Sequence, residues 1–510
     1  MKSIKLLLPF ILLLTLCECS VQKAQLFSKK SKNEYEFIIL QLNDVYEIAP
    51  IQNGQYGGMA RVETVRKNLL KENKNTLAVL AGDFLNPSLL GTIKVNGERI
   101  RGKQMVDVMN AMDFDLVAFG NHEFDLSYQD LQKRINESKF AWISSNVSHK
   151  KSDIKVKFYK EIDGEKYPLK ETFIKEFIFD ENKKLKIGFI SVCIPSNLKD
   201  YVYYGDIFKE ITRSYNELKP KVDVVLGLTH VTIAQDKKIA KLLPDIPLIM
   251  GGHEHTNSYD RLGNVCIAKA DANAKSVYIH RFKYNPITKK VTFKSELKEI
   301  NHLIQKDPNV DKIVKKWQNI LSTKLKEVVD NPSEIIYTTK EPLDARDTPI
   351  RSRQTNMGKV ITKAMSYAFN NAIDCALVNG GSIRIDDMLS GEISGIDIFR
   401  VLPYGGSVFK VKLVGRLLQK VLDYGENSVG RGAYLQRYNV NKINGNWIID
   451  GKKIDVNKVY TVAVSDYLMK GLDIPFLHEK NKEVLGVYKP LKKEIANDIR
   501  NAVIVYLKKL

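Results

Sequence analysis

Five hydrophobic segments in the first half of the chain each end in residues that commonly bind metal ions. The segments are typical of buried strands, and a carboxylate, amide or imidazole follows the end of each within three residues. The residues concerned are Asp44, Asp83, Asn121, His122, His230, His253 and His255. Because ligands in open α/β sheets bind outside the carboxyl ends of the strands, we expect these side chains to meet in one crevice. Oxygen and imidazole ligands without a thiolate predict a site for Mn²⁺, Zn²⁺, Fe or Co, and they argue against a structural zinc centre.

The same hydrophobic segments alternate with helical patterns over residues 35–300. Buried strands are predicted at 37–42, 77–80, 116–119, 185–192, 222–228 and 246–250, and helices at 61–70, 103–112, 126–135 and 233–243. The alternation predicts an α/β fold, a layered domain with mixed sheets flanked by helices. The charged stretch at 150–184 interrupts this order and predicts an inserted hairpin or lobe.

A second α/β domain is predicted over residues 336–510. A long, charged helical pattern at 307–329, followed by Asn331-Pro332, predicts a helical connector within 301–335. Beyond it, helical patterns at 357–369 and 417–422 alternate with strand-like segments at 376–378, 408–413 and 458–464. We therefore expect two α/β domains joined by the connector.

The amino terminus has the pattern of an export signal. Two lysines precede an apolar stretch at 6–16, which is shorter than the roughly 18 residues that a spanning helix needs. We predict that residues 1–19 are a signal and that the protein is exported to the periplasm or cell envelope.

Leu14-Thr15-Leu16-Cys17 resembles a bacterial lipoprotein box, so we expect a lipid on Cys17 to anchor the protein to a membrane. Plain secretion and a retained apolar anchor are the alternatives. Residues 20–34 are polar and rich in lysine, as in a tether between anchor and domain.

The composition excludes several classes of protein. Hydrophobic residues make up 44% and charged residues 27% of the 510 residues, as in folded soluble chains and not in disordered ones. The formal net charge of +20 favours anionic partners, but no compact basic run contains interleaved aromatic residues. We therefore expect no nucleic-acid binding, and the sequence indicates no obligate protein partner.

The residues at the strand ends resemble the five sequence blocks of the calcineurin-like metallophosphoesterases. The blocks are Asn43-Asp44, Gly82-Asp83, Gly120-Asn121-His122-Glu123, His230 and Gly252-His253-Glu254-His255. The second half is similar to the carboxyl-terminal domain of the 5′-nucleotidase / UDP-sugar hydrolase family, through Asn356-Met357-Gly358, Asn379-Gly380-Gly381-Ser382-Ile383-Arg384 and Leu402-Pro403-Tyr404-Gly405-Gly406. The resemblance covers nearly all of residues 35–510. It implies a catalytic domain followed by a substrate-binding domain.

The resemblance also implies a role for each strand-end residue. Asp83 would bridge two divalent ions, of Mn, Zn, Co, Mg or Fe. The other ligands would be Asp44 and His255 for the first ion, and Asn121, His230 and His253 for the second. A carboxylate bridge suits ions about 3.5–4 Å apart, which activate a metal-bound hydroxide for in-line attack on phosphorus.

His122 would be the histidine that protonates the leaving oxygen, and Asp125 would orient its ring. A structural role as the cap of the next helix is the alternative for Asp125.

Tyr46 stands where the family has a histidine ligand. A phenol with a pKa of about 10 is a poor ligand unless the metal deprotonates it, which favours a ferric ion. Tyr46 is therefore a doubtful ligand, and it is the one residue that favours an alternative function: a nucleotide-binding or surface-interaction lipoprotein with a decayed first metal site. Retention of the seven strand-end residues argues for activity.

The second domain should supply substrate recognition. Tyr404 and Tyr467 align in order with two aromatic residues that sandwich the base in the family, although a half-buried strand position is the alternative for either. The remaining expected substrate contacts are Arg351, Asn379, Arg384 and Asp473, for phosphate, base and ribose. The sequence around Asp473 departs from the Gly-Gly-Asp-Gly of the family. We expect release of phosphate from 5′-mononucleotides, with nucleoside diphosphates, UDP-sugars and 2′,3′-cyclic nucleotides as alternatives.

Overall fold

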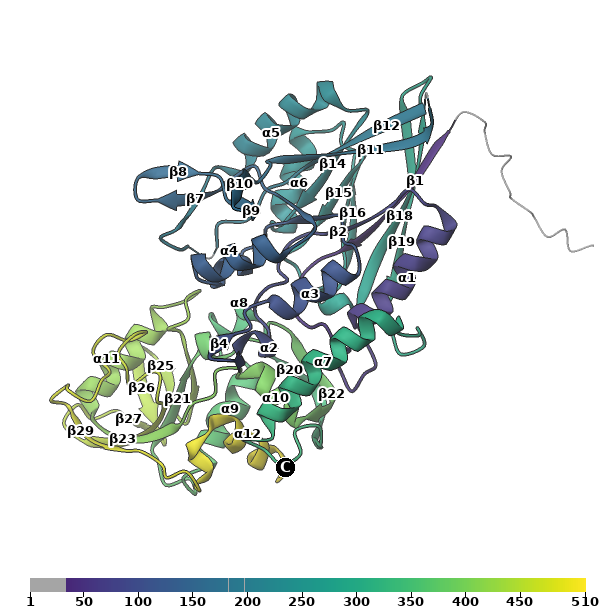
Figure 1. Ribbon diagram of the computed structural model, residues 1–510. Coiled ribbons are helices and arrows are strands. Elements are labelled where there is room, and N and C mark those ends of the chain that lie inside the picture. Colours follow the sequence, from purple (N-terminus) through teal and green to yellow (C-terminus); the bar gives the residue numbers. More distant parts are fainter. Residues whose placement is uncertain (1–33, 182, 197) are drawn as a thin grey trace, which may run out of the picture.

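The computed structural model describes residues 34–510 except 182 and 197 (Figure 1). The predicted signal at 1–19, the lipid anchor at Cys17 and all but the last residue of the tether lie outside the described residues. Within the described part of the chain, no helix is both long and apolar enough to span a bilayer.

Within the described residues, the first half of the chain folds around two six-stranded mixed sheets. The first has the order β19 (Lys290–Glu299), β18 (Ser276–Asn285), β1 (Tyr35–Leu42), β2 (Thr76–Leu80), β5 (Leu116–Ala118) and β6 (Ala141–Ile143). The second has the order β11 (Thr172–Asp180), β12 (Lys183–Ile190), β14 (Val224–Thr229), β15 (Leu248–Gly251), β17 (Val265–Lys269) and β16 (Ser258–Leu262).

The two sheets pack face to face, with helices on the outer sides. Phe37, Leu77, Phe189 and Leu226 are among the buried side chains between the sheets. Helices α1 (Met59–Glu72), α3 (Lys103–Ala111) and α4 (Tyr128–Glu137) cover the first sheet, and α5 (Ile207–Leu218) and α6 (Ile233–Leu242) cover the second. This arrangement confirms the predicted layered α/β domain, because each sheet buries apolar side chains on both faces.

Parallel pairing brings the ends of the central strands together. Leu42, the last residue of β1, lies opposite Leu80, the last residue of β2, and Thr229 of β14 lies opposite Gly251 of β15. The polar residues that follow these strands therefore start from the same edge of each sheet.

The predicted insertion is smaller than residues 150–184. Its first part forms hairpins outside the main sheets, from β7 (Val147–Lys151), β8 (Ile154–Val156), β9 (Tyr159–Ile162) and β10 (Glu165–Pro168). The prediction is wrong for β11, which pairs antiparallel with β12 at the edge of the second sheet. Its Phe177 is buried in the core between the sheets, so the alternation of this stretch reflects an edge strand with one buried face.

Residues 335–510, all of which the structure describes, form the second domain. Its five-stranded sheet has the order β24 (Leu435–Tyr438), β21 (Cys375–Asn379), β28 (Val459–Ser465), β23 (Val408–Val414) and β29 (Val484–Tyr488). Helix α11 (Gly415–Glu426) packs on one face, and α9 (Asn356–Tyr367) and α12 (Ile499–Leu507) pack on the other. A ribbon of β20 (Ile335–Asp344) and β22 (Met388–Ser394) and the short helix α10 (Gly395–Val401) complete the domain.

The predicted connector helix is α7 (Pro308–Leu325). Asp307 caps its first turn by accepting hydrogen bonds from the backbone N–H groups of Asn309 and Val310, and Pro308 occupies the first helical position. Its buried side packs against α1 and α3 (Figure 1).

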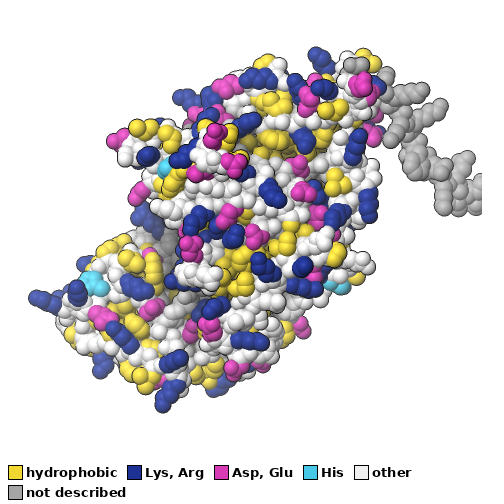
Figure 2. Space-filling view, viewed as in Figure 1, with side chains coloured by type: hydrophobic (Ala, Val, Ile, Leu, Met, Phe, Trp, Pro, Cys, Tyr) yellow, Lys and Arg dark blue, Asp and Glu magenta, His cyan; other side chains and the backbone are white. Residues whose placement is uncertain are grey.

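Charged side chains are mixed on the face of the molecule drawn in Figure 2. Lysines and arginines are scattered over both domains there, with acidic residues between them. On this face the excess of positive charge does not gather into one patch.

A buried polar chain crosses between the two large sheets. The Gln41 amide nitrogen donates hydrogen bonds to the carbonyls of Ala268 (2.8 Å) and Gly251 (3.3 Å), and its oxygen lies 2.8 Å from His280 Nε2. His280 Nδ1 lies 2.8 Å from the hydroxyl of Ser295. Because the Gln41 oxygen can only accept, His280 must donate through Nε2, and a neutral ring then accepts from Ser295 through Nδ1. Burial lowers the pKa of His280 to about 3.

We expect His280 to make stability depend on pH. An unfolded histidine has a pKa of about 6.5, so as the pH falls the unfolded chain takes up this proton before the folded chain does. The stability contributed by neutral His280 is complete above about pH 6.5 and is lost towards pH 3, with about 3 kcal/mol lost at pH 4. In urea unfolding, the His280→Gln variant should lose less stability than the wild type between pH 7 and pH 4.

A matched control is His302→Gln, which changes an exposed histidine and should keep the wild-type pH dependence. An equal loss of stability in His280→Gln and the wild type would contradict the neutral, buried state of His280.

Candidate metal and phosphate site

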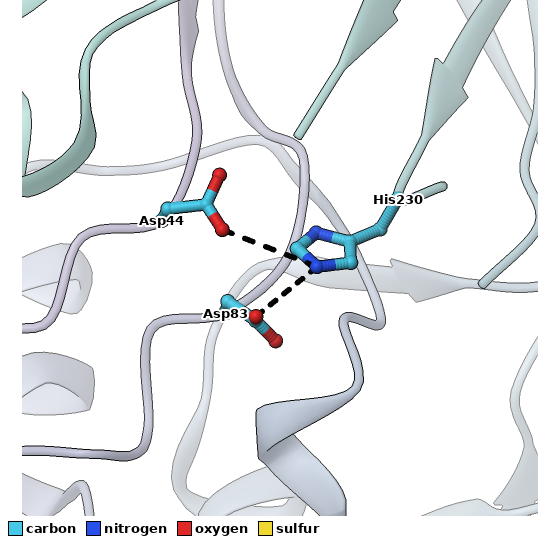
Figure 3. A group of neighbouring side chains, drawn as sticks. All are labelled: Asp44, Asp83 and His230. Atoms are coloured by element: carbon cyan, nitrogen blue, oxygen red, sulfur yellow. Dashed lines mark ion pairs between the residues drawn. The ribbon is translucent and has the colours of Figure 1, made fainter. Parts of the chain in front are cut away.

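Asp44, Asp83 and His230 meet in a buried group at the ends of β1, β2 and β14 (Figure 3). His230 Nε2 lies 3.1 Å from Asp83 Oδ2 and 4.0 Å from Asp44 Oδ1. Burial alone would lower the pKa of His230, but the Asp83 and Asp44 carboxylates raise it to about 9. The two carboxylates therefore create a place where a positive charge is strongly favoured.

The backbone around these aspartates is tightly folded. Asp44 and Asp83 adopt left-handed conformations, with φ of 54° and 59°, which are uncommon for residues other than glycine and often occur at functional sites. A Cβ atom on Gly120 would lie only 2.1 Å from Asp83 Oδ1. Glycine at this position thus lets the Asp83 carboxylate sit against the neighbouring turn.

His230 presents the correct nitrogen for a metal ion. Its Nδ1 lies 2.7 Å from the carbonyl of Ala81 and donates to it, so Nε2 is the nitrogen that would bind a metal ion, which would displace the Nε2 proton. That Nε2 faces Asn121 Oδ1 at 3.1 Å as well as Asp83. Two other predicted ligands, Asp83 and Asn121, therefore contact this nitrogen.

His253 lies next to His230 and Asp44. Its ring centroid is 5.5 Å from that of His230, and its backbone N–H donates to Asp44 Oδ2 at 3.0 Å. Burial and then the charge of His230 lower the pKa of His253 to about 4. The ring is accordingly neutral, which is the form that binds metals.

His255 and Tyr46 lie against Asp44 and Asp83. Tyr46 Oη lies 3.0 Å from His255 Nε2 and donates to Asp83 Oδ2 at 3.4 Å, while Asp44 Oδ1 is 3.5 Å from His255 Nε2. Burial, followed by the charges of Asp83 and Asp44, raises the pKa of the Tyr46 phenol well above its ordinary value. The doubtful ligand thus lies among the predicted ligands of the first ion as a neutral hydrogen-bond donor.

His122 and Asp125 form a hydrogen-bonded pair within one turn of 3-10 helix, η1 (His122–Asp125). His122 Nδ1 lies 2.8 Å from Asp125 Oδ2. Burial lowers the pKa of His122, but the charges of Asp83 and Asp125 outweigh it and raise this pKa to about 9. The pair can therefore hold a proton that is available for transfer at neutral pH.

The alternative role of Asp125 as a helix cap is wrong. Helix α4 is capped by Ser127, whose hydroxyl accepts a hydrogen bond from the backbone N–H of Asp130. Asp125 Oδ2 instead accepts from Asn86 Nδ2 at 2.8 Å and from Arg384 Nη2 at 2.6 Å, in addition to His122.

Glu123 holds the Asp83 loop in place, a role that the sequence analysis missed. Its buried carboxylate accepts hydrogen bonds from four backbone N–H groups, those of Gly120 (2.7 Å), Asp83 (2.9 Å), Phe84 (2.8 Å) and Leu85 (3.1 Å). Glu123 belongs to the Gly-Asn-His-Glu block, and its place in this block was the one feature of the sequence that could have drawn attention to it. Its partners are spread over two loops, so only the folded chain identifies its role.

Lys269 fixes the loop that carries His253 and His255, and it too was missed. Its buried ammonium donates to the carbonyls of Val231 (2.6 Å) and Gly252 (2.8 Å), and it pairs with Asp236 Oδ2 (2.9 Å) and Glu254. No pattern in the sequence marks this lysine, because its partners come from three separate segments.

The second domain closes one side of a shared cavity of about 690 Å³. The catalytic-domain side includes Asp83, Asn121, His122, His253 and His255, and the other side includes Arg351, Asp347 and Asp386. Arg351 Nη2 pairs with Asp347 Oδ1 at 2.6 Å, and its buried Nε has no hydrogen-bond partner among the described residues. A guanidinium with an unused donor beside the predicted metal ligands suits a phosphate group.

Three of the expected substrate contacts form one hydrogen-bonded group. Asp473 accepts from Asn379 Nδ2 at 2.7 Å and from the Tyr467 hydroxyl at 3.1 Å. Burial raises the pKa of the Tyr467 phenol, and the electrostatic effects of Asp473 and Tyr404 raise it further, to about 12. Tyr404 and Tyr467 are 52% and 36% exposed and lie in turns, so the alternative of half-buried strand positions is wrong.

Arg384, the sixth expected contact, points to the catalytic domain. Its Nη2 donates a hydrogen bond to Asp125 Oδ2. Burial lowers the pKa of the Arg384 guanidinium, but the electrostatic effects of Asp125 and then Tyr404 outweigh burial and raise this pKa. Arg384 thereby links the His122–Asp125 pair to the region of the exposed tyrosines.

Comparison with family models agrees with this geometry. The model of the calcineurin-like phosphoesterases matches residues 37–257, and the model of the 5′-nucleotidase C-terminal domain matches residues 335–479. The chain belongs to the 5′-nucleotidase family. The resemblance noted in the sequence is thus confirmed, and the protein is a metal-dependent phosphoric ester hydrolase of the 5′-nucleotidase type.

Relatives within the 5′-nucleotidase family cover most of the chain. The 5′-nucleotidase of Homo sapiens is 24% identical over 506 residues, which span 86% of this chain and 84% of the human protein. A snake venom 5′-nucleotidase of Crotalus adamanteus is 25% identical over 437 residues, which span 78% and 71%. The structure of a 5′-nucleotidase precursor from Thermus thermophilus matches with a TM-score of 0.67 at 19% identity, over 93% of this chain and 96% of that one, and so shares the two-domain fold.

Proposed function

We propose that this protein is an exported 5′-nucleotidase that releases phosphate from nucleoside 5′-monophosphates with the help of two divalent metal ions. The observation that carries the proposal is the shared cavity, which is lined by Asp83 of the Asp44, Asp83 and His230 group, by His122 of the His122–Asp125 pair and by Arg351 of the second domain. The names of the relatives support a nucleotide as substrate.

The residues present fit two metal ions that share Asp83. Asp44 Oδ1 is buried and makes no hydrogen bond among the described residues, as expected for a ligand atom kept for a cation. His255 would complete the first site, and Asn121, His230 and His253 the second. Such a pair of ions lowers the pKa of a bound water and neutralises phosphoryl oxygens.

The protein's own groups would position the substrate and move its proton. His122 would give its proton to the leaving oxygen of the ribose, and Asp125 would keep the ring oriented through Nδ1. Arg351 would bind phosphate oxygens, and the Asn379–Asp473 pair would bind polar groups of the nucleoside. Tyr404 and Tyr467 would stack on the base.

We propose the same division of the chain that the sequence predicts, with a catalytic domain at 35–300, a connector at 301–335 and a substrate-binding domain at 336–510. Export and anchoring through Cys17 rest on the amino-terminal pattern alone. Cys17→Ala should release the protein from membranes if that residue carries the lipid.

The function is tested by measuring released phosphate over a panel of nucleotides and metals. The panel contains AMP, UMP, ADP, UDP-glucose and 2′,3′-cyclic AMP, each with Mn²⁺, Mg²⁺, Zn²⁺ or Co²⁺. We expect the largest kcat/KM for a 5′-monophosphate, loss of activity with EDTA and its return with added metal. Hydrolysis of UDP-glucose or the cyclic nucleotide alone would change the substrate assignment, and nucleotide binding without hydrolysis under every metal would favour a decayed site.

The exposed tyrosines should matter only for substrates that contain a base. Replacing both Tyr404 and Tyr467 by Ala removes two stacking contacts of about 1–3 kcal/mol each. The transition-state stabilisation for AMP, obtained from the ratio of the wild-type and variant kcat/KM values, should therefore fall by about 2–6 kcal/mol. Hydrolysis of p-nitrophenyl phosphate, which has no base, should stay near the wild-type rate.

Tyr488→Ala is a matched control, because it changes an exposed tyrosine on β29 of the same domain. Equal losses on both substrates in the double variant would indicate damage to the fold. Unchanged rates on both would remove the stacking role.

A further inference from the structure

Asp386 is a residue of the second domain that reaches the ligands of the first metal site. It lies between β21 and β22, directly after the segment that contains Asn379 and Arg384. Its backbone oxygen lies 2.6 Å from His255 Nδ1, and its Oδ2 lies 3.4 Å from His255 Nε2. Its other oxygen, Oδ1, accepts from the backbone N–H of Asp347 at 2.6 Å.

The ligand-type atoms around His255 Nε2 come from both domains. Within 3.5 Å of this nitrogen lie Asp44 Oδ1 (3.5 Å), Asp386 Oδ2 (3.4 Å) and the hydroxyl of Tyr46 (3.0 Å). Carboxylate oxygens and a neutral imidazole are good ligands for divalent ions, whereas a protonated phenol is a poor one. Asp386 therefore brings an additional carboxylate oxygen close to His255, which Asp44 also contacts.

Two further observations concern the oxygen atoms that would hold a cation there. The buried Asp44 Oδ1 has no hydrogen-bond partner among the described residues. Asp386 is held in a left-handed conformation, with φ of 48°, and its carboxylate is fixed by the backbone of Asp347. The second domain thus holds this oxygen in a set orientation towards the site.

We infer that Asp386 is a ligand of the first metal ion, supplied by the second domain in place of the weak phenol of Tyr46. This inference rests on the proposed function, because it requires a metal ion at Asp44 and His255. It implies that an ion at the first site favours the arrangement of domains seen here, since one of its ligands comes from each side.

The test measures metal binding by the full-length protein without nucleotide. Mn²⁺ is titrated into metal-free protein, and the ions bound per chain are counted by mass spectrometry after dialysis. We expect Asp386→Asn to weaken one of two sites by about 10–100-fold or more and to leave the other nearly unchanged. Asp44→Asn should weaken the same site and so identify it.

The variants are matched to exclude damage to the fold. Asn tolerates the left-handed backbone of Asp386, and its amide oxygen can still accept from Asp347. Asp387→Asn is the control, because Asp387 is the next residue and pairs with Lys275 of the catalytic domain at 3.1 Å. It should keep both affinities.

A second variant tests the relation to Tyr46. Tyr46→His adds an imidazole to the first site, so in that background Asp386→Asn should cost less affinity than in the wild type. An equal or larger cost would contradict the replacement of Tyr46 by Asp386.

The outcomes separate this inference from the proposed function. If Asp386 only neutralises His255 and competes with the metal, Asp386→Asn will bind Mn²⁺ as tightly as the wild type or more tightly, and the inference is overturned. The proposed function would survive that result, because two ions would still bind. Failure of the wild type to bind two ions would overturn both.

Discussion

Asp83→Asn should abolish phosphate release and lower the metal content of the protein. Both carboxylate oxygens of Asp83 are in use, since Oδ2 contacts His230 Nε2 at 3.1 Å and Oδ1 accepts from the backbone N–H of His122 at 2.7 Å. An amide keeps the shape but removes the charge that two ions would share. A loss of several kcal/mol of transition-state stabilisation corresponds to at least about a 10³-fold lower rate of phosphate release.

The effect of Asp83→Asn is measured by steady-state kinetics with AMP and by metal content after dialysis. Asp245→Asn is the control, because it removes a carboxylate exposed on the surface, and it should match the wild type in both. A near-normal rate and metal content in Asp83→Asn would exclude a bridging role.

His122→Ala should keep the metal ions and lose about 10²–10⁴ in rate. Its ring is held by Asp125 and is not part of the Asp44, Asp83 and His230 group, so its removal should take away proton transfer without taking away a ligand. The loss should be larger for AMP than for p-nitrophenyl phosphate, because a nitrophenolate leaves without needing a proton. The measurement is kcat for both substrates at saturating Mn²⁺.

His149→Ala provides the comparison for His122→Ala. His149 of β7 stacks on Tyr128 of α4 and does not line the cavity, so its removal should leave kcat unchanged. Loss of bound metal in His122→Ala would make His122 a ligand. Equal losses on the two substrates would show that it does not protonate the leaving group.

The residue types of the candidate metal site could be predicted because strands and their ends leave local signals. A short apolar run predicts a buried strand, and the polar residue that follows it must lie at the edge of a sheet. Asp44, Asp83 and His230 follow this rule, and the structure brings them into contact. The spacing of His122 and Asp125 is also local, since one helical turn is enough to join them.

Edge strands and supporting residues were harder to predict. β11 has one buried face, so its alternating pattern resembles that of an isolated hairpin, and only its pairing with β12 assigns it to the main sheet. Glu123 and Lys269 stabilise the loops of the site through backbone groups of distant segments. Backbone donors and acceptors are present at every position, so the sequence cannot indicate which of them a buried charge will meet.

The sequence by itself determined which residue types are available for chemistry: the predicted ligands, their order along the chain, and the aromatic and arginine residues of the second domain. The tertiary structure decided how the two domains meet. It joined Arg384 to Asp125 and Asp386 to His255, contacts that span 259 and 131 positions. Local periodicity records which side of an element is buried, but the partner of that side depends on the relative placement of whole domains, and no nearby residue encodes it.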